Sequence, residues 1–164
     1  MPTKRLLIGF GIGVVAVAVA VAAVFYMQRG AHIELKGSIL KVRTAAMDEH
    51  SAVAVVDFRF ANPASYVFVV RKVDVSIVGA DGNTYEGWAV SEVDARRLFE
   101  YYKALGQKFN NSLLTRDKVA PRTTDDRMIA ARFEIPVALL DSRRNLTVRI
   151  EDVDGPVSEL SEKQ

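Results

Sequence analysis

An uncharged stretch of 22 residues near the start of the chain constrains most strongly what this protein can be. Leu6 to Met27 reads LLIGFGIGVVAVAVAVAAVFYM. As an α-helix it would be about 33 Å long, close to the ~30 Å hydrocarbon core of a bilayer. Lys4 and Arg5 precede it, and Phe25 and Tyr26 fall where interfacial aromatic residues gather. The stretch therefore predicts one membrane-spanning helix over residues 6–27.

A cleaved signal peptide is the alternative interpretation of this stretch. It has a basic start, and small residues at Ala20, Ala22 and Ala23 would suit a signal peptidase. However, the apolar run is longer than the usual core of about 7–15 residues, and it continues through Met27 beyond such a cleavage site. We therefore favour a retained anchor.

Small residues within the stretch could allow two such helices to pair. Gly9 and Gly13 form a GxxxG pattern, which lets membrane helices approach closely. Glycine and alanine are also simply common in membrane helices. A homodimer formed through Gly9 and Gly13 is therefore a hypothesis.

The position of the stretch sets the expected organisation and location of the chain. We expect a short tail over residues 1–5, a juxtamembrane segment over 28–37, a β-sandwich over 38–155 and a polar tail over 156–164. Lys4, Arg5 and the terminal amine favour a cytoplasmic N-terminus. The protein is then a single-pass protein of the cell membrane, with its soluble domain on the extracytoplasmic side.

Charge and cysteine content exclude several classes of function. The formal net charge of +2 comes from Lys4 and Arg5, so the rest of the chain carries equal numbers of basic and acidic residues. Such a domain has no basic footprint for nucleic acid. The chain contains no cysteine, which excludes disulfides, thiol nucleophiles and thiolate metal sites.

Alternating apolar and polar residues dominate the region after the anchor, as in β-strands. Asp81-Gly82 is typical of a tight hairpin turn. Phe58 and Phe133 lie on the apolar faces of clear strands and are expected in the core. The expected strands are 32–44 with a bulge at Gly37, 52–61, 66–79 as a pair or one bent strand, 84–90, a segment near 112–115, 128–135 and 146–153, with a polar loop over 121–127.

One amphipathic helix is expected among these strands, over residues 91–105. Ser91 and Asp94 have capping-box spacing, and Gly106 can end the helix. Its apolar stripe is Leu98, Tyr101, Tyr102 and Leu105. The fold class is therefore mainly β: an immunoglobulin-like β-sandwich of about seven strands with one inserted helix, preceded by a single N-terminal transmembrane helix.

Several short motifs carry a family resemblance across residues 38–152. VVDFRFANP ends at Asn62-Pro63, a DGNTY hairpin follows at 81–85, and RFEIP at 132–136 precedes LTVRI at 146–150. This pattern resembles the immunoglobulin-like domains of the late-embryogenesis-abundant type 2 (water-stress) group and of bacterial membrane-anchored proteins of unknown function. The resemblance implies an immunoglobulin-like fold without catalytic residues.

Catalytic and metal-binding patterns are missing from the sequence. The chain has two histidines, His32 and His50, but no GxSxG motif whose serine either could activate as a general base. Asp152, Asp154 and Gly155 lack the spacing of a calcium loop and are interpreted as an acidic turn. We expect no catalytic residue, no cofactor and no metal.

Aromatic residues near the expected helix form the densest cluster in the domain: Trp88, Phe99, Tyr101 and Tyr102. Such a cluster either completes the core or forms an exposed patch for a partner or lipid headgroup. If the domain binds a partner, we expect it to do so here.

The sequence thus favours a non-catalytic, membrane-anchored envelope protein that presents a β-sandwich surface for binding or scaffolding. One alternative is a small subunit of a membrane complex that acts through its transmembrane helix. A hydrolase is a second alternative, which the missing nucleophile and base argue against.

Overall fold

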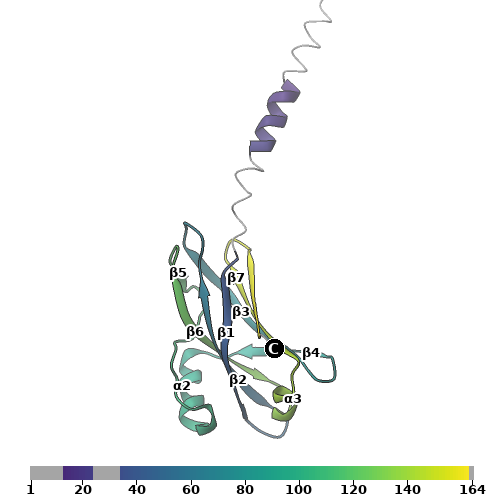
Figure 1. Ribbon diagram of the computed structural model, residues 1–164, viewed down its shortest axis with the longest axis vertical. Helices are drawn as coiled ribbons and strands as arrows, with labels where there is room; N and C mark the ends of the chain where they lie inside the picture. Colours follow the sequence, from purple (N-terminus) through teal and green to yellow (C-terminus); the bar gives the residue numbers. More distant parts are fainter. Residues whose placement is uncertain (1–12, 24–33, 163–164) are drawn as a thin grey trace, which may run out of the picture. The chain divides into compact units, whose positions relative to one another are not determined.

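The computed structural model describes residues 13–23 and 34–162, which belong to two separate units. Residues 13–23 are helical (Figure 1). No helix in the described part of the chain is long and apolar enough to cross a membrane. The remainder of the predicted span 6–27, with Gly9, lies outside the described residues, as do the tail 1–5 and residues 28–33. Gly13 has open space where a side chain would be.

The second unit is mainly β, and within residues 34–162 it contains one eight-stranded sheet. All neighbouring strands run antiparallel, in the order β1-β2-β6-β4-β3-β7-β8, with β5 paired to β3. The elements are β1 (Lys36–Ala46), β2 (Ala52–Ala61), β3 (Phe68–Val78), β4 (Thr84–Ala89), α2 (Glu92–Tyr101), η1 (Lys103–Leu105), β5 (Lys118–Val119), β6 (Thr124–Phe133), α3 (Val137–Asp141), β7 (Asn145–Asp152) and β8 (Val157–Ser161).

β4 joins the two halves of this sheet. Thr84 to Gly87 pair with β3, and Trp88 and Ala89 then pair with β6. At the outer edges, the backbone N–H of Leu35 donates to Ser158 Oγ of β8 at 2.7 Å. The sheet therefore curls nearly into a barrel around one apolar core.

Large aromatic side chains fill this core. Phe58 and Phe133 are fully buried, which confirms the prediction for both. Gly87 lies against the Phe133 ring, where an added Cβ would come within 2.5 Å of a ring carbon. Only glycine leaves room for this ring at the point where β4 changes its partner.

Two segments expected to be loop or tail instead form strands. β6 begins at Thr124, inside the expected loop 121–127, because its backbone pairs with β2 although its first side chains are polar. β8 forms within the expected polar tail 156–164, since Ser158 and Leu160 are buried against the sheet. β5 and β8 are the strands that were not expected, and no strand forms at 112–115, so residues 34–162 contain eight strands instead of about seven.

Other boundaries follow the sequence more closely. β2 occupies the predicted residues, and β3 is one strand with a register shift between Val70 and Lys72. The bulge in β1 lies between Ile39 and Lys41, beyond Gly37. The segment near 112–115 contributes one isolated parallel bridge, between Ser112 and Met128.

The inserted helix forms, but it is shorter than predicted. α2 ends at Tyr101, and η1 covers residues 103–105 before Gly106. The Ser91 cap is confirmed, because Ser91 Oγ accepts a hydrogen bond from the Asp94 N–H at 3.1 Å.

Candidate binding groove

α2 covers the outer face of β2 and β6. Ala95, Leu98 and Phe99 from the helix pack in a second apolar cluster with strand residues such as Val53 and Val55. β2 is consequently buried on both faces along most of its length. This packing holds the helix in a fixed position over the sheet.

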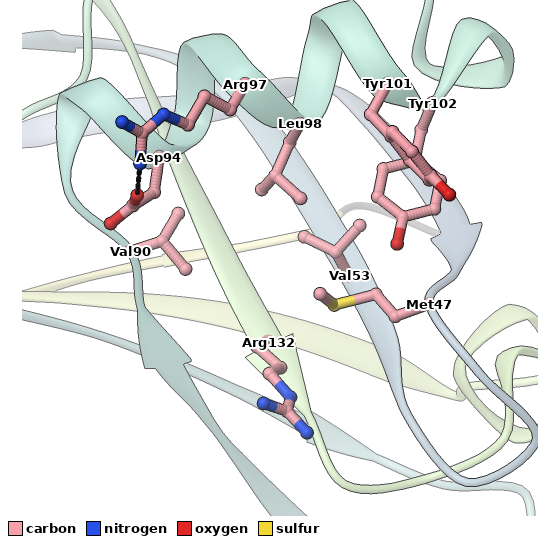
Figure 2. Close-up of a pocket in the computed structure, with 9 residues that line it drawn as sticks. All are labelled: Met47, Val53, Val90, Asp94, Arg97, Leu98, Tyr101, Tyr102 and Arg132. Carbon is pink, nitrogen blue, oxygen red and sulfur yellow. Dashed lines mark hydrogen bonds and ion pairs between the residues drawn. The ribbon is translucent and has the colours of Figure 1, made fainter.

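A groove of about 440 Å³ remains between α2 and the strands beneath it. Its volume lies in the range of small-ligand pockets, about 300–1,000 Å³. Figure 2 shows Leu98, Tyr101 and Tyr102 extending from the helix toward the strands. The groove is lined by Met47, Val53, Val90, Asp94, Arg97, Leu98, Tyr101, Tyr102 and Arg132.

Two tyrosines form the rim of the groove at the end of α2. Tyr101 is 79% exposed, whereas Tyr102 is half-buried against the second cluster. Their rings meet edge to face, with centroids 4.9 Å apart. Tyr101 therefore offers an aromatic surface to solvent while Tyr102 supports it.

Charged side chains lie around the apolar lining. Arg97 pairs with Asp94 at 3.4 Å (Figure 2). Asp94 also accepts a hydrogen bond from Ser91 Oγ. The Arg132 side chain is exposed and makes no hydrogen bond or ion pair with any residue that the structure describes, although its charge contributes to the lowered pKa of Asp48. It pairs in register with Trp88 of β4, which is 66% exposed.

The structure separates the four aromatic residues singled out by sequence. Tyr101 and Tyr102 line the groove, and Trp88 lies beside it on β4. Phe99 is 8% exposed and belongs to the second cluster, so it is a packing residue. The expectation that Tyr101 belongs to a buried stripe is wrong, because α2 buries Ala95, Leu98 and Phe99 and leaves Tyr101 outside that face.

Sequence reasoning missed the strand side of the groove. Met47, Val53 and Val90 come from β1–β2, β2 and the end of β4, and Arg132 comes from β6. The continuous apolar run Ala52 to Val56 was a usable signal, because a strand without polar positions is covered on both faces.

A buried ion pair fixes the segment that follows α2. Arg43 of β1 contacts Asp57 of β2 at 2.6 Å, and both side chains are buried. Arg43 Nη1 also donates to the carbonyls of Leu105 and Gln107, each at 2.6 Å. Its guanidinium lies 4.9 Å from the centroid of the Phe99 ring. Through these contacts, Arg43 connects α2 and η1 to the sheet.

Glu92 ties the same segment to the start of α2. Its carboxylate lies 2.8 Å from Lys108 Nζ and accepts the backbone N–H of Ser112 at 3.0 Å. Burial disfavours the charged carboxylate, but the hydrogen bonds from Lys108 and Ser112 outweigh it and lower the pKa of Glu92 to about 2. The folded state therefore favours ionised Glu92.

The Glu92→Gln variant should lose stability in a pH-dependent way. A depressed pKa stabilises the fold above the unfolded pKa of about 4.5, and this contribution disappears as the pH falls toward 2. We expect the variant to be about 1–2 kcal/mol less stable at pH 7, since partial exposure weakens the full effect. Urea unfolding of residues 34–164 at several pH values measures this. A deficit that stays constant from pH 7 to 3 would show that the Glu92 charge is not responsible.

No catalytic arrangement is visible among the described residues. His50 lies in the exposed turn after β1, and His32 lies outside the described part. Asp152 is buried, and its Oδ1 lies 3.4 Å from both the Val69 and Asp154 backbone nitrogens, so it supports the turn after β7. Within residues 13–23 and 34–162, no three histidine, aspartate or glutamate side chains gather as metal ligands.

Comparisons with known proteins give distant structural likenesses. No family model matches the chain, and no curated protein matches it. A crystal structure of an uncharacterised β-sandwich protein from Clostridium difficile 630 is similar over 79% of this chain and 86% of that one, with 9% identity and a TM-score of 0.38. A chain of the Iho670 flagellar-like filament covers 92% of this chain and 95% of its own, with 13% identity and a TM-score of 0.33. The assignment of the fold rests on the strand pairing described above.

Proposed function

We propose that this protein is a non-catalytic, single-pass membrane protein whose β domain lies on the extracytoplasmic side and binds a protein partner in the groove beside α2. The uncharged run Leu6–Met27 supports the anchor. The curled antiparallel sheet, with α2 inserted between β4 and β5 and the short α3 between β6 and β7, supports an immunoglobulin-like β-sandwich, related to the late-embryogenesis-abundant type 2 group or to bacterial membrane-anchored domains.

The observation that carries the binding function is the composition of the groove. An apolar lining lies between an exposed tyrosine, Tyr101, and an arginine without an ion pair to any described residue, Arg132. Tyrosine, tryptophan and arginine are the residues most enriched where binding energy concentrates in interfaces. Trp88, paired in register with Arg132, extends this surface.

The same composition defines the occupant. An apolar side chain fits between Met47, Val53 and Leu98. A carboxylate beside it would give Arg132 a hydrogen-bonded partner, which its longer-range attraction to Asp48 does not supply, since arginine binds carboxylates through two hydrogen bonds. We therefore propose a segment of another protein that carries an apolar residue next to an aspartate or glutamate.

Photocrosslinking tests this proposal in native membranes. A photoreactive phenylalanine analogue at position 101 should yield one discrete adduct, and Arg132→Met should abolish it. The same analogue at the exposed position Glu159 of β8 is the control and should give no such adduct. An adduct with a second copy of the chain, or one that survives Arg132→Met, would contradict the proposed partner.

Tyr101→Ala should separate binding from folding. The side chain is largely exposed, so we expect the free energy of unfolding to change by less than about 0.5 kcal/mol. Partner capture should nevertheless be lost. Thermal and urea unfolding of residues 34–164 measure the first effect, and a loss of stability above about 1 kcal/mol would mean that Tyr101 serves the fold.

A further inference from the structure

Three loops lie together at the end of the β domain where β1 begins. Lys36 pairs with Ala61, and Ala61 also pairs with Thr124, so the loops 62–67 and 120–123 lie at this end. Val70 pairs with Asp152, which places the turn 153–156 there too. Figure 1 shows the starts of β1 and β6 and the β7–β8 turn at one end of the domain.

Two of these loops expose large apolar side chains. Tyr66 is 38% exposed, Val67 44% and Val153 48%. The loops are neighbours, because the Val153 N–H donates to the carbonyl of Val69 at 3.0 Å. They form an apolar tip that the core does not cover.

Buried polar residues hold the apolar tip in shape. Asn62 is 1% exposed, and its amide donates to the carbonyls of Tyr66 at 2.9 Å and Val119 at 3.2 Å. Asp152 is 2% exposed and accepts the Asp154 N–H. The exposure of the tip is thus built into the fold, and docking it would require little ordering.

Basic side chains surround the apolar tip. Arg116, Lys118 and Arg122 are exposed and form no ion pair with any described residue. Lys118 pairs in register with Val69, and the backbone N–H of Arg116 donates to the carbonyl of Val70 at 2.6 Å. Both residues therefore lie next to the start of β3.

Acidic side chains at this end offset the cations only in part. Asp154 and Glu34 are the exposed acids near the tip. Asp117 accepts the Leu114 N–H at 2.9 Å and lies 3.8 Å from Arg127, so it is already engaged. Apolar loop tips with basic neighbours suit a lipid surface, where apolar groups enter the headgroup boundary and cations meet anionic lipids.

We propose that the apolar tip and its cations dock on the bilayer that carries the anchor. This inference rests on the proposed membrane span. Only residues 28–33 separate Met27 from Glu34, so their Cα atoms are seven steps apart and at most about 25 Å from each other. The end of the domain that holds Glu34 must then stay close to the headgroups, and the bilayer is the surface always within its reach.

This docking would also hold the groove away from the lipid. Met47 and Val53 flank the turn after β1, at the opposite end of that strand from Lys36. The 11 residues of β1 span ten steps of ~3.3 Å, which places its two ends about 33 Å apart. The groove would face a partner at a fixed height above the membrane.

The absence of cysteine in the natural chain makes a clean test possible. Single variants Val67→Cys, Val153→Cys and, as the far-end control, Glu49→Cys are labelled with an environment-sensitive fluorophore. The full-length protein is reconstituted in phosphatidylcholine vesicles with and without phosphatidylglycerol. Alkaline extraction followed by flotation first establishes whether the chain is anchored.

At positions 67 and 153 we expect a blue shift and quenching by doxyl-labelled lipid, stronger with phosphatidylglycerol and weaker at high salt. Position 49 should show neither effect. Anchored protein without quenching at 67 and 153 overturns the docking while leaving the anchor intact. A blue shift that increases with the number of protein molecules per vesicle, without quenching by doxyl-labelled lipid, would mean that the tip contacts a second copy of the chain. That result would also contradict the docking. Release of the chain from the vesicles at alkaline pH would contradict both the proposed anchor and the proposed docking.

Discussion

Truncation of Phe133 to alanine should lower the free energy of unfolding by about 3–5 kcal/mol, the usual range for a fully buried phenylalanine. Phe133 lies at the end of β6 with no exposed surface, and its ring packs against the backbone of Gly87. Its removal leaves a cavity where β4 changes from β3 to β6, a point that joins both halves of the sheet. Urea unfolding of residues 34–164 measures the effect.

Tyr101→Ala serves as the matched aromatic control for this prediction, because that side chain is mostly exposed. If Phe133→Ala cost less than about 1 kcal/mol, as a surface change does, the register of β6 in the sheet would be wrong.

Asp57→Ala should lower the free energy of unfolding by about as much as Phe133→Ala, roughly 3–5 kcal/mol. The substitution leaves the buried Arg43 guanidinium without its counter-charge. Arg43 would keep its bonds to the Leu105 and Gln107 carbonyls but lose the carboxylate at 2.6 Å. Asn110, which donates to Asp57 Oδ1 at 2.9 Å, would lose its acceptor as well. Hydrogen exchange should therefore rise across 103–110 together with the loss of stability.

An exposed ion pair on the same strand provides the control. Arg59 and Asp126 lie 2.6 Å apart, but their side chains are 57% and 37% exposed. Asp126→Ala should therefore cost at most about 1 kcal/mol. The double variant Arg43→Met, Asp57→Leu should recover part of the loss, since apolar residues can replace a buried pair. Equal, small effects of Asp57→Ala and Asp126→Ala would show that burial of the first pair does not matter.

Local patterns were sufficient for the strands and core positions. The alternation around Phe58 predicted β2 with its observed bounds, because one face of that strand meets the main core. Ser91 predicted the start of α2 for an equally local reason, a side-chain oxygen that accepts a first-turn N–H. Such features depend on neighbours within a few residues.

Features that depend on distant residues escaped prediction. The pairing of Arg43 with Asp57 was not predicted, because the residues that cover the pair come from the distant segment 103–110. β8 is short and polar in appearance, and it forms because β7 offers a free edge.

The groove was predictable only on its helical side. Its aromatic rim was expected from the cluster near α2, but Tyr101 was assigned to the core, whereas the buried face of α2 consists of Ala95, Leu98 and Phe99. Arg132 carries no local sign of its position, because pairing between β4 and β6 places it beside Trp88.

Alkaline carbonate extraction of membranes that contain the full-length chain shows directly whether the protein is anchored. We expect the chain to stay in the membrane pellet with residues 6–27 still attached, as shown by its N-terminal sequence, while a variant lacking residues 6–27 appears in the supernatant. Recovery of the natural chain in the supernatant, with its N-terminus beyond residue 20, would show a cleaved signal peptide and contradict a membrane-anchored protein.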